Sequence, residues 1–503
     1  MMAQANTGFF DALLQQLAYD EKTPMIFSSG LFFWLFAAFM VGYALLQRKN
    51  TSRLVYVLAF SYYFYYKSSG TYFFLLALVT CSDFVIANYM GRMKNRVGRK
   101  LLVALSLLVD LGILGYFKYT NFLLEILGDL GWEGLHSMDI FLPVGISFFT
   151  FQSLSYTIDV YRRKIRPLDS LLDYAFYVSF FPQLVAGPIV RASDFIPQIR
   201  RPLTVTREMV GMGFWFIITG LFKKAVISDY IAANFVDRIF ADPTLYSGLE
   251  SLLGVYGYAL QIYCDFSGYS DMAIGIALLM GFHFNINFNS PYKAVSITDF
   301  WRRWHISLST WLRDYLYISL GGNRHGKVRQ YINLFLTMFL GGLWHGAAWN
   351  FVLWGSMHGI ALAVHKQWMS VTKGRRWVST RWWRVASVLL TFHFVLFAWI
   401  LFRDSTFSLS AFSTTKTSTI LSNIFTNFHP ELFMGVVEGY WKVLAFIVVG
   451  FILHFVPDRT EQRCKTAFVK WPTWTYCVAL VLIVIFVIQI KSSDVQPFIY
   501  FQF

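Results

Sequence analysis

The stretch QYINLFLTMFLGGLWHGAAWNFVLWGSMHGIALAVH, residues 330–365, contains no Asp, Glu, Lys or Arg. Its 36 residues exceed the roughly 20 that a helix needs to cross the bilayer core. Gly341-Gly342 lies inside it. Two segments, or one span and a re-entrant piece, would fit this length, because backbone polar groups within a bilayer must be hydrogen-bonded by the protein itself. The stretch therefore predicts helices embedded in a membrane.

The whole composition agrees with a membrane protein. Of the 503 residues, 56% are hydrophobic and 14% are charged, and the mean hydropathy is +0.49. Soluble domains carry about 25% charged residues, so a disordered chain is excluded and a soluble enzyme is disfavoured. Residues 25–47, 385–402 and 471–490 are further charge-free runs. We predict an all-α, polytopic transmembrane helical bundle with roughly ten to twelve spans, plus short re-entrant or interfacial helices.

The net charge of +15 comes from short basic clusters between apolar runs. One such cluster comprises Arg92, Lys94, Arg96, Arg99 and Lys100. Loops held at an anionic leaflet explain this distribution better than nucleic-acid binding, because the intervening runs must leave water. We therefore expect membrane lipid, and no nucleic acid, as a partner.

The N-terminus differs from the rest of the chain. Phe9, Phe10, Leu13, Leu14 and Leu17 recur at helical spacing within a polar segment. Residues 1–24 are expected to form an interfacial helix or a frayed terminus. Residues 25–503 are expected to form a single transmembrane domain with its catalytic core at about 141–365. The scattered cysteines and the lack of an HExxH motif predict no metal site.

The first polar set within apolar sequence is YCDFSGYSD, residues 263–271. Asp265 and Asp271 are six residues apart and would not share one face of a continuous helix. Gly268 is expected to break the helix between them. Asp265 and Ser267 either line a cavity or belong to a structural network that pairs with a nearby Lys or Arg.

The second set is DFWRRWHISLS, residues 299–309. Ser296 and Asp299 have the spacing of a capping box, which predicts a helix starting at residue 297. On that helix one stripe would contain Trp301, Trp304, His305, Leu308, Trp311, Leu312 and Tyr315. His305 is then either a satisfied core histidine or a catalytic one. Arg302 and Arg303 either bind the phosphates of an acyl carrier or anchor the helix at lipid headgroups.

The third set surrounds His345, which is flanked by small residues in the charge-free stretch. Small residues allow close helix contact or a ligand beside the backbone. His358 is a weaker candidate. Two neutral imidazoles in separate apolar segments suit proton transfer in a site without water, such as deprotonation of a hydroxyl that attacks an activated acyl group.

These motifs resemble the membrane-bound O-acyltransferase (MBOAT) family, in particular its bacterial polysaccharide branch. The resemblance rests on FLPVGISFFTFQSLSYTIDVYR (141–162), FFPQLVAGPIVR (180–191), QIYCDFSGYSDMAIG (261–275), FWRRWHISLSTWLRDYLYISLGGNR (300–324), LGGLWHGAAWNFVLWGSMHG (340–359) and FIYFQF (498–503). The resemblance implies many helices around a tunnel that crosses the bacterial inner membrane.

The resemblance also implies acyl transfer from a cytoplasmic thioester, with acetyl-CoA as the expected donor and no bound cofactor. His305 and His345 would be catalytic, with His305 nearest the acyl group. Substrate-binding candidates are Arg302, Arg303, Trp304, Asp265, Ser267 and Asn350. An extracytoplasmic acyltransferase partner would complete O-acetylation of an exported polysaccharide such as alginate. D-alanyl transfer to teichoic acid is the alternative within the family, and an acyl-group transporter is an alternative of another class.

Overall fold

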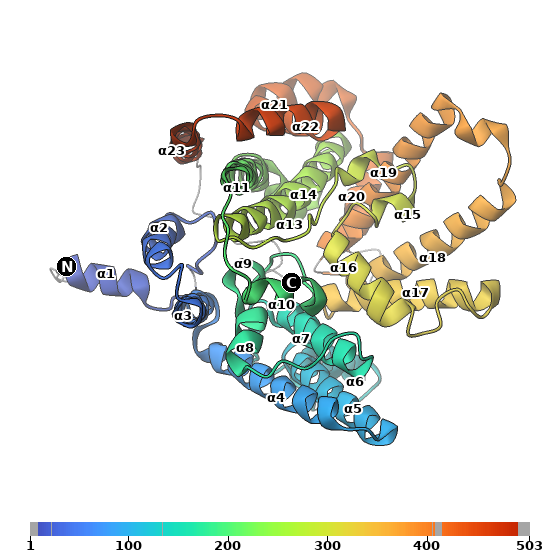
Figure 1. Ribbon diagram of the computed structural model, residues 1–503. Coiled ribbons are helices and arrows are strands. Elements are labelled where there is room, and N and C mark those ends of the chain that lie inside the picture. The colour runs from blue at the N-terminus through green and yellow to red at the C-terminus, as the bar shows by residue number, and fades with distance from the viewer. Residues whose placement is uncertain (1–8, 22, 133, 405, 408–414, 491–503) are drawn as a thin grey trace. The chain divides into compact units, whose positions relative to one another are not determined.

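The computed structural model describes residues 9–21, 23–132, 134–404, 406–407 and 415–490 (Figure 1). Within this part of the chain every regular element is a helix, which confirms the predicted all-α class. The residues form two compact units, Met1–Thr204 and Val205–Phe503. His305 and His345 both belong to the second unit. The predicted division at residue 24 and the predicted core at 141–365 stay predictions, and FIYFQF lies outside the described residues.

The helices of the first unit are α1 (Phe9–Leu17), α2 (Gly30–Leu45), α3 (Asn50–Ser69), α4 (Phe73–Arg92), α5 (Arg96–Leu114), α6 (Thr120–Asp129), α7 (Ile146–Tyr161), α8 (Leu171–Ser179), α9 (Phe181–Leu184) and α10 (Ala192–Ile199). Helix α1 covers residues 9–17 of the N-terminal segment, and the interfacial position of that segment stays a prediction. Helices α4, α5 and α7 pack against one another. Buried Asp83 of α4 joins them, because it accepts hydrogen bonds from Ser106 and Ser153.

Arg99 corrects one expectation about the basic loops. Its side chain is buried, and its guanidinium donates to the carbonyl oxygens of Met90, Val160 and Tyr161 at 2.9, 2.9 and 2.7 Å. The last carbonyls of a helix lack partners within the helix, so a buried arginine can satisfy them. Arg99 therefore ties helix ends together and lies in a helix instead of a loop, whereas the position of this basic cluster at the leaflet stays a prediction.

The helices of the second unit are α11 (Arg207–Leu221), α12 (Asp229–Ile231), α13 (Asp237–Ala241), α14 (Gly248–Leu279), α15 (Ile297–Phe300), α16 (Ile306–Trp311), α17 (Gly326–His345), α18 (Trp349–Val371), α19 (Arg381–Arg403), α20 (Lys416–Thr426), α21 (Phe433–Phe455), α22 (Asp458–Val469) and α23 (Thr473–Ile490). Segments Phe222–Ser228 and Leu312–Tyr317 are π-helical.

The charge-free stretch 330–365 forms two helices, which is the first of the two arrangements that its length allowed. Helices α17 and α18 lie side by side (Figure 1) and are separated by extended backbone at Gly346 and Ala348. A Cβ atom built on Gly342 would lie 2.9 Å from the Cα of Gly355. The pair of glycines therefore lets the two helices approach at backbone distance just before His345.

Helix α14 runs without a break through Gly268, so the predicted break was wrong. A Cβ atom at Gly268 would lie 2.6 Å from the carbonyl oxygen of Gly220 in α11. The glycine is required by close packing of α11 against α14 and leaves the helical backbone intact.

Six described segments are long and apolar enough to cross a membrane: Asn50–Arg92, Arg96–Asp129, Arg207–Ala241, Arg381–Arg403, Pro430–Phe455 and Thr473–Ile490. Helix α2 is apolar but shorter. The chain is a multi-pass membrane protein. The total of ten to twelve spans and the tunnel between them stay predictions.

Candidate active site

The segment that carries His305 starts as the sequence predicts and then departs from a helix. Ser296 Oγ accepts a hydrogen bond from the Asp299 N–H at 3.2 Å, and α15 begins at Ile297. Helix α15 ends at Phe300, and His305 has the left-handed backbone angles φ 43° and ψ 56° directly before α16. The predicted continuous helix was therefore wrong.

Contacts with residues 287–289 explain the break. The Asn289 N–H donates to the Arg303 carbonyl, and the Ile306 N–H donates to the Asn287 carbonyl, both at 2.9 Å. These bonds replace those that a continuous helix would make within itself. The seven residues of the predicted aromatic stripe are nevertheless all buried, with exposed fractions of 8% or less. Apolar periodicity thus identified the buried residues but not the local backbone.

His305 is fully buried and lies among aromatic rings. The Phe266 ring meets the imidazole edge to face at a centroid distance of 4.6 Å, and the Trp344 ring lies at 6.1 Å. Its Nδ1 atom is 3.2 Å from the side-chain oxygen of Asn287. Burial disfavours the charged imidazolium, so this environment favours a neutral imidazole that can accept a proton.

His345, the last residue of α17, belongs to the same aromatic cluster. Its ring centroid is 5.0 Å from that of Trp344, 5.1 Å from that of Trp354 and 5.5 Å from that of Phe402. The Trp344 indole thus contacts both candidate histidines, although they are 40 residues apart in sequence. The structure brings the two imidazoles into one buried site.

His358 of α18 contacts Trp354, which also contacts His345. Its centroid is 4.7 Å from that of Trp354, and its Nδ1 accepts a hydrogen bond from the Trp301 indole N–H at 3.3 Å. Phe394 contacts His358 and also lines a large cavity. Ring contacts thus link His358 both to Trp354, which contacts His345, and to a residue of that cavity.

The cavity has a volume of about 1330 Å³ and is formed by α15, α18 and α19 with the segments beside them. Its apolar wall includes Leu353, Met357, Ile360, Leu390 and Phe394. Its basic and titratable lining includes Lys293, Arg302, Arg303, His365, Lys366 and Arg384. An apolar cavity with several cations is suited to a ligand with an extended uncharged part and an anionic end.

The two predicted arginines differ in their contacts. Arg303 Nε lies 3.1 Å from both carboxylate oxygens of Asp299, and its Nη1 donates to the Asn289 carbonyl at 3.3 Å. Arg302 is exposed at the cavity. Arg303 therefore stabilises the local fold, and Arg302 is the better placed of the two to bind an anion.

The other four predicted substrate-binding residues lie outside the described lining of this cavity. Trp304 packs against Trp399 at a centroid distance of 4.9 Å. Asp265 forms an ion pair with Lys224, as in the second alternative from the sequence, a structural network with a nearby Lys or Arg. Ser267 is fully buried in α14, and Asn350 donates to the Phe402 carbonyl at 3.1 Å. Trp304 and Asn350 thus pack beside the histidine cluster.

Sequence reasoning missed Asn287 and Trp344, which contact His305 directly. Asn287 belongs to NINFN, residues 285–289, where three asparagines alternate with apolar residues just before the arginine and histidine motif. This alternation of asparagines and apolar residues is the sequence feature that could have identified Asn287. Trp344 is adjacent to His345, so its position beside that residue could have been noted from the sequence alone.

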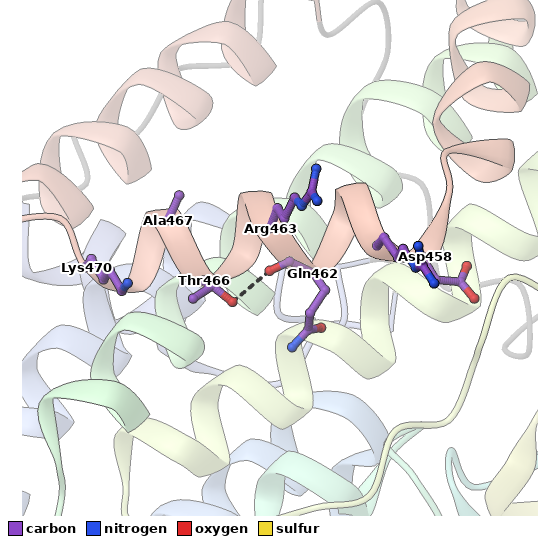
Figure 2. Close-up of a pocket in the computed structure, with 7 residues that line it drawn as sticks. Asp458, Gln462, Arg463, Thr466, Ala467 and Lys470 are labelled. Atoms are coloured by element: carbon purple, nitrogen blue, oxygen red, sulfur yellow. Dashed lines mark hydrogen bonds between the residues drawn. The ribbon is translucent and has the colours of Figure 1, made fainter.

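A second hollow follows α22 (Figure 2). Its lining side chains come from α22 and from Lys470 directly after it, and within the helix the Thr466 hydroxyl donates to the Gln462 carbonyl at 2.8 Å. Asp458, at the start of α22, pairs with Lys293 of the large cavity at 2.7 Å. None of the residues that line this hollow belongs to the histidine cluster, so we assign it no catalytic role.

The apolar helices, the two buried histidines that contact Trp344 and the cationic cavity are the features of a membrane protein with a buried polar site. Residues 14–412 match the membrane-bound O-acyltransferase family. The chain belongs to this family and is an O-acyltransferase.

Three relatives illustrate the match. The chain is 43% identical to the probable alginate O-acetylase AlgI of Pseudomonas aeruginosa, over 75% of this chain and 72% of that protein. It is 33% identical to the peptidoglycan O-acetyltransferase of Helicobacter pylori, over 95% and 98%. It is 30% identical to the teichoic acid D-alanyltransferase of Bacillus subtilis, over 54% and 71%. The similarity to the two O-acetylating proteins is therefore greater in identity and coverage.

Proposed function

We propose that the protein transfers an acetyl group from a cytoplasmic thioester, acetyl-CoA, for O-acetylation of an exported polysaccharide, with alginate as the first candidate. His305 and His345 are the proposed catalytic residues. The observation that carries this proposal is the Trp344 indole in contact with both buried imidazoles. The names of the acetylating relatives support the acetyl group and the class of acceptor.

The cavity supports a thioester donor on the cytoplasmic side. Residues 366–384, which run from the last turns of α18 to the first turn of α19, contain six Lys or Arg residues and no Asp or Glu. By the positive-inside rule such a segment lies in the cytoplasm, and it contributes Lys366 and Arg384 to the cavity. Arg302 would bind the donor's phosphates, and the apolar wall would hold its uncharged arm. We place the protein in the bacterial inner membrane on this basis.

Acyl transfer to a hydroxyl requires a base beside the hydroxyl that attacks the acyl carbon. As the acceptor hydroxyl oxygen attacks the thioester carbonyl, the imidazole of His305 takes the hydroxyl proton. The new C–O bond forms, the C–S bond breaks, and the proton passes to the leaving thiolate. General base catalysis of this kind contributes about 10²–10⁴-fold. His345, whose ring also contacts the Trp344 ring, would hold or deliver a proton in the same site.

Hydrogen bonding of two nearby serines favours direct transfer over a covalent acyl-serine. The Ser307 hydroxyl donates to the Asn287 side-chain oxygen at 2.9 Å, and the Ser309 hydroxyl donates to the Trp304 carbonyl at 3.2 Å. The Ser307 hydroxyl oxygen also lies 3.5 Å from His305 Nδ1, but its proton is donated in the shorter hydrogen bond to Asn287 and is not passed to the imidazole, as activation of a nucleophile requires.

The acceptor stage involves a second protein in this proposal. An extracytoplasmic acyltransferase would receive the acetyl group and place it on the polymer. Such a division agrees with the described part of the chain, which consists of packed helices and contains no compact unit outside the two already named.

The rival within the family is D-alanyl transfer from a carrier protein, and the rival of another class is an acyl transporter. Purified protein in liposomes should cleave ¹⁴C-acetyl-CoA when the partner acyltransferase and an acceptor oligosaccharide are present, and it should not use D-alanyl carrier protein. Turnover with the carrier protein alone would replace acetyl transfer by alanyl transfer. Appearance of unreacted acetyl-CoA within the vesicles, without ester formation, would favour a transporter.

A further inference from the structure

Asn287 is the residue that organises the backbone and the side chain at His305. It is almost fully buried, and its carbonyl oxygen accepts the Ile306 N–H at 2.9 Å. Its side-chain oxygen Oδ1 accepts the Ser307 N–H at 3.1 Å and the Ser307 hydroxyl at 2.9 Å. Asn287 therefore binds the free N–H groups at the start of α16, as an N-cap residue would, but from a different segment.

His305 needs such support because its backbone is in the left-handed region, with φ 43°. In that region the Cβ atom of a residue other than glycine crowds the backbone. A residue stays in this conformation only where surrounding contacts hold it, and such positions cluster at functional sites. The hydrogen bonds from residues 306 and 307 to Asn287 fix the backbone on the C-terminal side of His305.

The same contacts determine which atom of the Asn287 amide faces His305. A backbone N–H can only donate, so the atom that receives the Ser307 N–H must be the amide oxygen. The amide nitrogen Nδ2 lies 3.2 Å from the hydroxyl oxygen of Ser270 and donates to it. The orientation of the amide is therefore set by partners other than the histidine, and the oxygen is the atom 3.2 Å from His305 Nδ1.

An amide oxygen accepts and cannot donate, so the hydrogen bond between them requires the proton on Nδ1. In a neutral imidazole the lone pair is then on Nε2. We propose that Asn287 is a positioning residue that holds His305 in the tautomer protonated on Nδ1, so that Nε2 is the atom that takes the acceptor's proton. The inference rests on the proposed function for its catalytic meaning, while the tautomer can be measured independently.

Solid-state NMR of ¹⁵N-histidine-labelled protein in bilayers gives the tautomer directly. The His305 signals are assigned by their loss in His305→Gln. The wild type should show a protonated Nδ1 and an unprotonated Nε2. Asn287→Ala should redistribute the proton toward Nε2. A wild-type His305 protonated on Nε2, or an Asn287→Ala protein with unchanged His305 signals, would overturn the inference.

Kinetics provide the second readout. Asn287→Ala should lower kcat by about 10²-fold or more, the contribution of a correctly presented base, while KM for acetyl-CoA stays within about twofold. Asn289→Ala is the matched control, because this exposed asparagine lies in the same segment and contacts Arg303 through its backbone only. Asn289→Ala should keep both kinetic constants. Equal losses in the two variants, or a change in KM alone, would contradict a positioning role.

Asn287→Asp covers the case in which the alanine variant does not fold. The aspartate keeps an oxygen for the Ser307 N–H and for Nδ1–H, but its charge favours the imidazolium. We expect Nδ1 of His305 to stay protonated in this variant; an Asn287→Asp protein whose His305 carries its proton on Nε2 alone would refute the inference. If His305→Ala retains full acetyl transfer while the Nδ1–H tautomer is observed, the catalytic role proposed for His305 fails and the tautomer assignment stands.

Discussion

Lys224 is the cation of a buried charge cluster, and its replacement gives a large expected effect on stability. Its ammonium lies 2.5 Å from Asp265 and 2.8 Å from Asp229. The Lys224 and Asp265 side chains are 1% and 3% exposed, whereas that of Asp229 is 17% exposed. Lys224→Met would leave two carboxylates without their shared cation. Removing one partner of a buried ion pair costs about 3–5 kcal/mol.

Asp265→Asn should cost less, about 1–3 kcal/mol, because Lys224 keeps its contact with Asp229. The double variant Lys224→Met/Asp265→Asn should be less destabilised than the sum of the single variants, with a coupling of about 0.5–3 kcal/mol. The free energy of unfolding can be measured by denaturation in mixed micelles, followed by tryptophan fluorescence. Exposed Lys373→Met is the matched control and should change the stability by at most about 0.5 kcal/mol.

Two results would refute this reasoning. If Lys224→Met costs no more than Lys373→Met, the cluster does not contribute as a buried ion pair. If Asp265→Asn leaves the free energy of unfolding unchanged but weakens donor binding, Asp265 is a substrate-binding residue, as the sequence allowed, and its structural role is wrong.

Two further predictions concern charged groups at the cavity. Arg302→Ala should raise KM for acetyl-CoA about tenfold with little change in kcat, as expected for the loss of one charge-assisted contact. Arg303→Ala should raise KM less, because Arg303 is already bound by Asp299. Steady-state kinetics that reverse this order would contradict the proposed donor site. Lys293 lowers the pKa of Asp458. Their ion pair at the surface should therefore contribute about 0.2–1 kcal/mol of stability above pH 4, and this contribution is lost as the pH falls further. Asp458→Asn should remove this pH dependence; a variant whose stability depends on pH as the wild type's does would exclude the contribution.

The sequence predicted the features that depend on local composition. Charge-free runs predicted α17, α18, α19 and α23, because a bilayer requires apolar residues over the length of a span. The pair Ser296 and Asp299 predicted the start of α15, since a capping interaction involves only neighbouring residues. Apolar periodicity also predicted which residues around His305 are buried.

The features that were not predicted depend on residues distant in sequence. The break before α16 arises from hydrogen bonds to Asn287, and the continuity of α14 at Gly268 arises from the glycine opposite it in α11. The partner of Asp265 is Lys224, 41 residues earlier. Periodicity and propensity describe one segment at a time, so they cannot indicate which second segment supplies these contacts.

The catalytic role of the two histidines can be tested most directly by single-turnover acetyl transfer from radiolabelled acetyl-CoA in liposomes. His305→Ala and His345→Ala should each lower the rate by about 10²–10⁴-fold, because each removes an imidazole from the buried site around Trp344. Thermal unfolding midpoints should confirm that both variants are folded. Full rates in both folded variants would show that acyl transfer takes place elsewhere in the protein.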